Sequence, residues 1–416
     1  MDFAETLRLP DGPDSPTGVP AAPGVCVGSL DDGEESYGAY GVRSVEDPVP
    51  VTADTLFRVA SISKLITATA LTRLGVGPDT LVRDHLPDFR VADPAAGEQV
   101  TVRDLLTHRS GWTPDGAAHR PADELDAGAL ARAVADLATA PQIFPLRRFH
   151  GYSNSGFIVL ARIVEVVAGE PYEHAARRLV FEPAGMERST FFTDEAVTYP
   201  IALGHRGDPP RVVRPWGRSR ARNGAGGLMT SARDLIAFSR HVLAEPHGMW
   251  VPLADASRPG EHVGTGWWIR DLPGGRRAVG HPGQTVGYTA RLTILPDSGR
   301  AFVILANSEA AGAALAKLTE EALGLPARDE PTEYLQAPDV RDHLGVYTDG
   351  TEDVRVDGTG DGVVLSGDGT GRIRFTGPDE GRDEGGMPVR FVRADGEVTW
   401  LRLGDRVLRR HPLKEG

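Results

Sequence analysis

Lysine is nearly absent from this chain of 416 residues, where it occurs only at Lys64, Lys317 and Lys414. Arginine supplies the other basic side chains, and the acidic residues outnumber both, so that the formal net charge is −13. This negative charge argues against nucleic acid or an anionic membrane surface as a partner. Because lysine is so rare, the position of each one is informative.

Cysteine and long apolar runs are scarcer still. The only cysteine, Cys26, excludes an intrachain disulfide, and its apolar neighbours predict a buried strand residue. No stretch is long and apolar enough to span a bilayer. Residues 1–5 lack the basic and apolar segments of a secretory signal. These features predict a cytoplasmic protein that does not contact a membrane.

Motifs for cofactors are also missing. The histidines are scattered, and the chain contains no Cys/His cluster and no H-E-x-x-H motif. No glycine-rich phosphate loop follows a predicted strand. We therefore expect neither a metal nor another cofactor.

The rare Lys64 follows a serine by three residues. Residues 57–64 read Phe-Arg-Val-Ala-Ser-Ile-Ser-Lys and lead directly into an apolar run over 65–71. This pattern predicts a strand or turn that delivers Ser61 to the start of a buried helix, where residues three apart share a face. A lysine removed from water can lose its proton near neutral pH and activate a neighbouring hydroxyl. Ser61 and Lys64 are thus a candidate nucleophile and base.

The order of the predicted elements indicates an α+β fold. Strands flank a turn at 31–33, helices fill the middle of the chain, and strands return from residue 266 before a helix over 308–323. Such an order predicts one antiparallel sheet built from both chain ends, with helices packed on it.

The composition divides the chain into four parts. Residues 1–18 are expected to form an irregular arm, and residues 19–324 the main domain. A proline-containing linker is predicted over 325–338. In the last part, 339–416, short strands alternate with Asp-Gly turns, which is typical of a small antiparallel barrel.

Two further motifs accompany Ser61-x-x-Lys64. Tyr152-Ser153-Asn154 precedes an apolar helix, and residues 280–284 read Gly-His-Pro-Gly-Gln on a predicted strand. In this order the three motifs resemble S-x-x-K, Y-x-N and K-T-G or H-x-G of the penicillin-binding proteins and serine β-lactamases. The resemblance covers about residues 20–323. It implies a β-lactamase/transpeptidase-like domain, with helices on both faces of the sheet and an all-α region, followed by a lipocalin-like barrel.

The resemblance also implies catalytic roles. Ser61 would be the nucleophile that forms an acyl-enzyme, and Lys64 its base. Asn154 would orient the lysine, and the phenol of Tyr152 would carry the proton to or from the leaving or incoming group. His281 would stand where relatives carry lysine or histidine.

Two positions on the predicted C-terminal strand complete the expected site. The backbone N–H groups of Ser61 and Gln284 would form the oxyanion hole. Gly283 would leave room for the substrate, because a side chain there would block its approach.

Plainer interpretations exist for single residues. Tyr152 alone fits a partly buried tyrosine, Asn154 a helix N-cap, and His281 a structural histidine. His108 is expected to cap or hydrogen-bond a loop, and Ser63 to pack. The joint occurrence of the motifs favours the catalytic interpretation of Ser61, Lys64 and Tyr152.

Three features of the sequence narrow the reaction that the resemblance implies. His281 offers only a partial charge near neutral pH, where penicillin-cleaving enzymes usually carry lysine, and this makes strong β-lactamase activity less expected. The missing export signal points the same way. The layout of catalytic domain plus small β domain resembles the penicillin-binding-protein-type thioesterases, which are standalone nonribosomal peptide cyclases.

The leading hypothesis is therefore a serine acyltransferase. Ser61 would take a peptidyl group from a carrier-protein thioester and release it by head-to-tail macrolactamisation. A cytoplasmic carboxylesterase or D-stereospecific peptidase with the same residues is the alternative, and an inactive binding module is a second. The barrel would form one wall of the cleft, and Arg409 and Arg410 either reach the peptide or remain solvated. The acceptor would be selected by loops such as 205–222.

Overall fold

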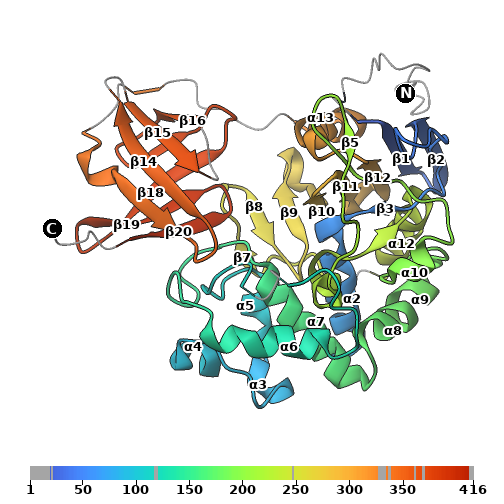
Figure 1. Cartoon of the computed structure of the whole chain (residues 1–416), viewed down its shortest axis with the longest axis horizontal. Helices are drawn as coiled ribbons and strands as arrows, with labels where there is room; N and C mark the ends of the chain where they lie inside the picture. The colour runs from blue at the N-terminus through green and yellow to red at the C-terminus, as the bar shows by residue number, and fades with distance from the viewer. Residues whose placement is uncertain are drawn as a thin grey trace.

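The computed structural model describes most of the chain (Figure 1). The predicted arm, 1–18, and most of the predicted linker lie outside the described residues. The described residues are 19, 22–116, 120–245, 248–326, 334–335, 339–359, 362–367 and 371–411.

One antiparallel sheet organises the larger domain. Its strand order is β2-β1-β12-β11-β10-β9-β8-β7, so strands from the two ends of the domain pair at β1 and β12. The prediction of a sheet built from both ends is confirmed. The strands are β1 (Gly24–Asp31), β2 (Glu34–Gly41), β7 (Ala254–Asp255), β8 (Glu261–Val263), β9 (Trp268–Asp271), β10 (Arg277–Thr285), β11 (Tyr288–Leu295) and β12 (Arg300–Ala306).

Helices cover both faces of this sheet. α12 (Ala232–Ala244) contacts β12, β1 and β2, and α13 (Gly312–Leu323) contacts β11 and β12. The side chains of β1 alternate between the two faces of the sheet. Cys26 lies in the main apolar core, whereas Val25 and Val27 pack with α13 in a second core. Cys26 is fully buried, as predicted.

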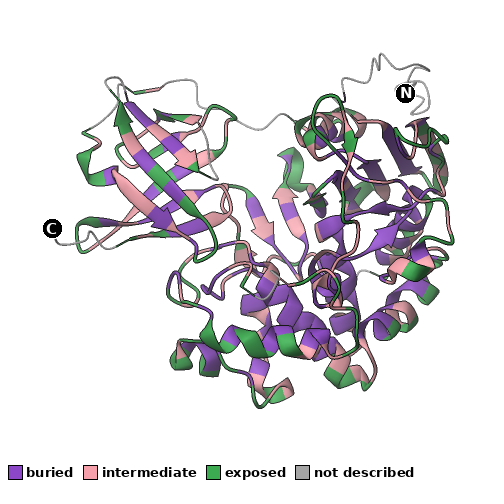
Figure 2. Cartoon of the chain, in the orientation of Figure 1, coloured by how far each residue is buried: buried purple, intermediate pink, exposed green. Residues whose placement is uncertain are grey.

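The all-α region lies beside the sheet and surrounds two buried helices (Figure 2). These are α2 (Ser63–Arg73) and α7 (Asn154–Ala168), whose C-cap Gly169 has a φ of +70° that glycine adopts without strain. No described helix is long and apolar enough to cross a membrane. The other helices are α3 (Val82–His85), α4 (Pro94–Gln99), α5 (Val102–Leu106), α6 (Ala129–Asp136), α8 (Tyr172–Ala176), α9 (Glu182–Ala184), α10 (Thr193–Ala196) and α11 (Asn223–Gly226).

The C-terminal part forms a closed antiparallel barrel in the order β13 to β20. Apolar side chains such as Tyr347, Phe375 and Phe391 fill its interior, as in other small barrels. The strands are β13 (Gly345–Thr348), β14 (Asp353–Thr359), β15 (Gly362–Gly367), β16 (Gly371–Phe375), β17 (Glu380–Arg382), β18 (Pro388–Ala394), β19 (Glu397–Leu403) and β20 (Arg406–Arg410).

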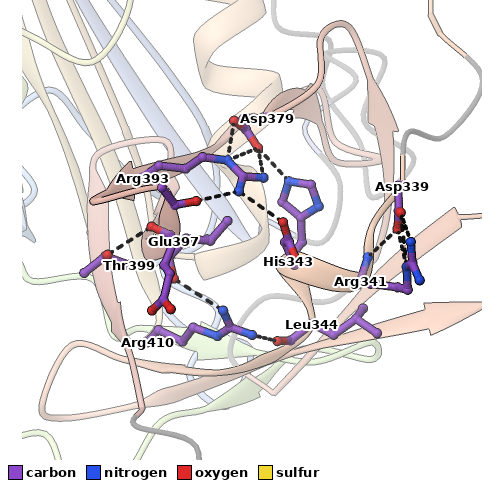
Figure 3. Close-up of polar contacts among 12 residues, drawn as sticks. Asp339, Arg341, His343, Leu344, Asp379, Arg393, Glu397, Thr399 and Arg410 are labelled. Atoms are coloured by element: carbon purple, nitrogen blue, oxygen red, sulfur yellow. Dashed lines mark hydrogen bonds and ion pairs between the residues drawn. The ribbon is translucent and has the colours of Figure 1, made fainter.

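Polar side chains hold the turn before β13 against the barrel (Figure 3). His343 Nε2 lies 2.8 Å from the Asp379 carboxylate, which also accepts from the Arg393 guanidinium. Arg410 donates to the Leu344 carbonyl oxygen at 2.6 Å. Arg410 therefore links β20 to the segment before β13. It neither reaches toward a peptide nor remains solvated, which were the two roles considered for it.

The barrel is docked on the helical region through one apolar cluster. Trp400 of β19 donates its indole N–H to the Ile143 carbonyl oxygen at 2.9 Å, and its ring contacts Phe149 edge-on. Phe144 and Val407 complete the buried contact. This interface fixes the β19–β20 turn relative to the catalytic domain.

Candidate active site

Ser61 lies on a tight turn in front of α2. The turn is η1 (Ala60–Ile62), which follows β3 (Phe57–Arg58). Ala60 has a φ of +46°, a left-handed conformation that costs a non-glycine residue energy and often marks a functional site. Ser63 holds the turn, since its hydroxyl donates to the Ala60 carbonyl oxygen at 2.6 Å and accepts from the Leu228 N–H at 3.0 Å. Ser63 thus packs, as expected, and also bridges two segments.

Lys64 is fully buried, and its Nζ faces three oxygen atoms. Nζ donates to Asn154 Oδ1 and to the Ala225 carbonyl oxygen, each at 2.7 Å, and lies 3.1 Å from Ser61 Oγ. A neutral amine has two N–H donors and one lone pair. With both donors used, its lone pair points at the Ser61 hydroxyl.

The surroundings of Lys64 favour the neutral amine. Burial lowers the pKa of Lys64 well below its ordinary value, and the Arg222 guanidinium lowers it further, while the Asp115 carboxylate opposes both. Desolvation dominates because an ammonium loses more hydration energy than an amine. Lys64 can therefore accept a proton from Ser61.

Tyr152 completes the contacts of Ser61 from the far side. Its hydroxyl donates to Ser61 Oγ at 2.7 Å, and its ring centre lies 4.9 Å from Lys64 Nζ. Burial raises the pKa of Tyr152, and the Ser61 hydrogen bond only partly offsets this effect. The phenol therefore stays protonated and can pass a proton but not act as a standing phenolate base.

Two segments hold the Tyr152 loop. The Ser153 N–H donates to His108 Nδ1 at 3.1 Å, and the Gly151 N–H donates to the His108 carbonyl oxygen at 2.8 Å. The expectation that His108 hydrogen-bonds a loop is confirmed. The Tyr152 N–H donates to the carbonyl oxygen of Asp405, in the β19–β20 turn of the barrel, at 2.7 Å.

Asn154 is the first residue of α7, and the N-cap is its neighbour Ser153, whose hydroxyl accepts from the Gly156 N–H. The alternative of an Asn154 N-cap is therefore wrong. The Asn154 amide instead bridges Lys64 and Asp115, to which its Nδ2 donates at 2.6 Å. Asp115 was not predicted, because nothing in its own segment links it to the three motifs.

Strand β10 lies directly against the turn of Ser61. A Cβ on Gly283 would come within 2.2 Å of the Val59 carbonyl oxygen. Gly283 is thus required by the contact between β10 and the Ser61 turn, whereas we expected it to clear a path for the substrate. Gln284 follows in the same strand, next to this contact, and its side chain donates to the Glu309 carbonyl oxygen.

His281 is buried in the same strand and carries no charge near neutral pH. Burial lowers its pKa to about 3, with Lys64 adding to the effect. Its Nε2 accepts the indole N–H of Trp268 at 3.1 Å, and its Nδ1 lies 2.5 Å from the Pro282 carbonyl oxygen. The ring stands 6.2 Å from that of Tyr152. The partial positive charge expected here is therefore absent.

The structure brings the predicted residues together from distant segments. Ser61, Lys64, Tyr152 and Asn154 form one hydrogen-bonded cluster, and His281 borders it. Among the described residues, no group of three or more His, Cys, Asp or Glu side chains is placed to hold a metal ion. The cluster can activate a hydroxyl for acyl transfer without one.

Several known proteins are similar to this chain in sequence and fold. A family model described as Beta-lactamase matches residues 17–325. Penicillin-binding protein 4 of Amycolatopsis lactamdurans is 30% identical over 341 residues, which are 73% of this chain and 85% of that protein. A D-aminopeptidase of Brucella anthropi is 26% identical over 74% of this chain and 60% of its own length.

The similarity to solved structures extends into the barrel. The crystal structure of SurE is 25% identical, with a TM-score of 0.75, and the match covers 94% of this chain and 95% of SurE. The family model and the SurE structure agree on the fold, and the family model and the relatives indicate a serine hydrolase. The chain therefore belongs to the β-lactamase family, which includes the penicillin-binding-protein-like serine hydrolases.

Proposed function

We propose that this enzyme transfers a peptidyl group from a carrier-protein thioester to Ser61 and releases it as a head-to-tail macrolactam. The observation that carries acyl transfer is the position of Ser61 Oγ, 3.1 Å from a buried amine and 2.7 Å from a partly buried phenol. A hydroxyl placed between a base and a proton donor can be acylated and then released.

In the acylation step, Lys64 takes the Ser61 proton while Oγ attacks the thioester carbonyl carbon. The backbone N–H groups of Ser61 and Gln284 stabilise the resulting oxyanion. The C–S bond then breaks, and the thiol leaves with a proton delivered through Tyr152 from Lys64. Asn154 keeps the lysine amine oriented through its 2.7 Å hydrogen bond.

In the release step, the amino terminus of the bound peptide attacks the ester carbonyl carbon. The amine loses a proton through Tyr152 to Lys64, and the ester C–O bond breaks. Ser61 Oγ regains its proton, and an amide bond closes the ring. The enzyme returns to its starting state without a cofactor.

The similarities support a peptide as the acyl group. A second crystal structure of SurE, 26% identical over 94% of this chain, is described as SurE with D-Leu. Relatives named D-aminopeptidase add to this support. The uncharged His281 offers no fixed cation to a substrate carboxylate, which favours a substrate other than a β-lactam.

Hydrolysis is the second candidate, with water as the acceptor. Besides the D-aminopeptidases, Esterase EstB of Burkholderia gladioli is 31% identical over 55% of this chain. The same four residues would serve a carboxylesterase or D-peptidase. Peptidyl carrier protein as partner and cytoplasm as location remain parts of the proposal.

The test is a reaction with a peptidyl N-acetylcysteamine thioester that has a free amino terminus, with products followed by mass spectrometry. We expect thiol release and a product lighter than the linear acid by one water. A Ser61→Ala variant should release no thiol. If peptides with varied D-residue termini give only the linear acid, the enzyme is a hydrolase.

A further inference from the structure

The turn between β19 and β20 carries Asp405 to the edge of the active site. Its backbone carbonyl oxygen accepts the Tyr152 N–H at 2.7 Å, so the main chain of Asp405 is fixed beside the proposed proton carrier. The carboxylate takes no part in that hydrogen bond, and 40% of the side chain is exposed. The charged group can therefore contact a ligand.

The nearest titratable partner of this carboxylate is a neutral histidine. His150 Nε2 lies 3.8 Å from Asp405 Oδ1, and His150 Nδ1 lies 3.1 Å from the Thr107 carbonyl oxygen. Because a carbonyl oxygen only accepts, Nδ1 carries the ring proton. Burial lowers the pKa of His150, although Asp405 opposes this, so Nε2 is an acceptor too. His150 Nε2 and Asp405 Oδ1 are thus two hydrogen-bond acceptors facing each other, and neither provides a donor for the other.

No arginine or lysine neutralises Asp405 within the described part of the chain. Arg402, on the same hairpin, is electrostatically coupled to the carboxylate but donates to the Ser257 hydroxyl at 3.0 Å instead. A half-exposed carboxylate beside a buried site, without an ion pair, is suited to a cationic ligand.

Asp405 also lines a cleft of about 770 Å³ between the barrel, the strands β8 to β11 and helix α13, together with Trp268, His281 and Pro282. His281 is uncharged there and already accepts from Trp268. Two cations farther along the cleft have carboxylate partners, since Arg270 pairs with Glu320 and Lys317 with Glu321. Arg258 and Arg291 also line it, and each already has an interaction partner.

We propose that Asp405 binds the free amino group of the acyl acceptor, as an ammonium ion, beside Tyr152. This inference rests on the proposed acyl transfer and names the acceptor: a primary amine of a peptide. The barrel thus contributes a specificity-determining side chain as well as a wall. The bound ammonium first releases its extra proton to solvent water at the exposed Asp405 carboxylate, and the neutral nitrogen then attacks the acyl carbon.

Asp405→Asn separates this role from a structural one. Asparagine keeps the shape and the backbone carbonyl that Tyr152 uses, and removes only the charge. The matched control is Asp395→Asn, since Asp395 is an exposed carboxylate in the β18–β19 turn of the same barrel, with a φ of +51°. Asparagine tolerates that conformation.

The kinetic experiment uses an N-acetylated peptidyl N-acetylcysteamine thioester, which has no amine, with D-leucine amide as an added acceptor. The first, pre-steady-state equivalent of thiol released measures acylation, and the rate of amide formation measures acceptance. We expect Asp405→Asn to keep thiol release within about twofold and to raise the half-saturating acceptor concentration at least about tenfold, a change of about 1.4 kcal/mol. Asp395→Asn should change neither.

If the half-saturating concentration of the acceptor is unchanged in Asp405→Asn, the inference is overturned. Equal losses of acylation and acceptance, with a lower melting temperature, would overturn it too, because they indicate a structural role. Wild-type enzyme that forms an acyl-enzyme but never yields the amide would contradict an amine site.

A binding experiment keeps the inference independent of the chemistry. Ser61→Ala enzyme is titrated with D-leucine amide and with its uncharged N-acetyl derivative by calorimetry. Binding of the amine that is lost on adding Asp405→Asn, with no binding of the acetyl derivative, supports the site even if no thioester is turned over. Equal binding of both ligands would refute it.

Discussion

Lys64 and Lys317 show how the same side chain is given different chemistry by its surroundings. Lys64 is completely buried and faces three oxygen atoms, whereas Lys317 leaves 77% of its side chain exposed and lies 3.8 Å from Glu321. Burial lowers the pKa of Lys64 because only its charged form needs water. The core around Lys64 therefore favours the neutral amine that the proposed base for Ser61 requires.

Replacing Lys64 by arginine tests this base. Arginine keeps a cation but does not deprotonate, so acylation should fall by about 10²- to 10⁴-fold. Lys317→Arg is the matched control and should leave the rate unchanged. The measurement is thiol release from the N-acetylated thioester, and a rate retained in Lys64→Arg would rule out Lys64 as the base.

The pH dependence of wild-type acylation follows from the same pKa. The neutral amine is the active form, so the rate should rise with pH through the lowered pKa of Lys64 and be lost below it. The rising limb should thus lie well below the ordinary lysine pKa of about 10.4. A pre-steady-state rate that keeps rising up to that pH would contradict a neutral Lys64.

Ionisation of His281 should not affect the pH dependence of acylation. With a pKa of about 3 it does not titrate in the working range, so His281→Gln should keep the shape of the curve. Loss of the buried Trp268 hydrogen bond should still cost about 1–3 kcal/mol of stability, measured by chemical denaturation. A limb that shifts in the variant would show that His281 ionises in the site.

At the scale of elements, β10 and the Ser61 turn approach each other closely at Gly283. Gly283→Ala should push these elements apart, because its Cβ would lie 2.2 Å from the Val59 carbonyl oxygen. We expect a loss of about 1–3 kcal/mol in stability and a slower acylation step. Gly312→Ala is the control: it begins α13 in open space and should be neutral or stabilising.

Wild-type stability and acylation in Gly283→Ala would mean that the strand moves freely at this point. The readouts are thermal unfolding and thiol release, measured on both glycine variants in parallel. Only a larger effect in Gly283→Ala than in Gly312→Ala supports the close contact, since an equal effect in both would reflect the added methyl group alone.

The sequence predicted the elements that have strong local signals. An apolar helix was expected after the motif Tyr152-Ser153-Asn154, and α7 already begins at Asn154. Two barrel strands, β13 and β17, were not predicted, because they are short, with four and three residues. Their pairing partners in the barrel define them more than their own sequences do.

The same limit applies to the site. Ser61, Lys64, Tyr152 and Asn154 could be predicted because each belongs to a motif of fixed spacing. Asp405 could not, since its position beside Tyr152 depends on how two domains dock. Long-range packing carries no local sequence signal.

At the scale of the whole molecule, Trp400 joins the barrel to the helical region. Trp400→Ala should remove the indole bond to Ile143 and the ring contact with Phe149, at a cost of about 3–5 kcal/mol. The Tyr152 loop should then lose its fixed partner, so acylation should slow as well. Trp400→Phe should fall between the two in a comparison of melting temperatures and thiol release.

Full activity in Trp400→Ala despite a lower melting temperature would show that the docked barrel is not needed to hold Tyr152. Retained stability with reduced activity would instead place the whole effect in the loop.

The pairing of β1 with β12 has a consequence for synthesis on the ribosome. The Gly24 N–H donates to Asn307, 283 residues later. The β1–β2 hairpin can therefore pair with β12 only after most of the chain has been synthesised. The turn that supports Tyr152 emerges later still. A growing polypeptide therefore holds Ser61 without its finished surroundings, and the contacts around Tyr152 are complete only after the β19–β20 turn has left the exit tunnel.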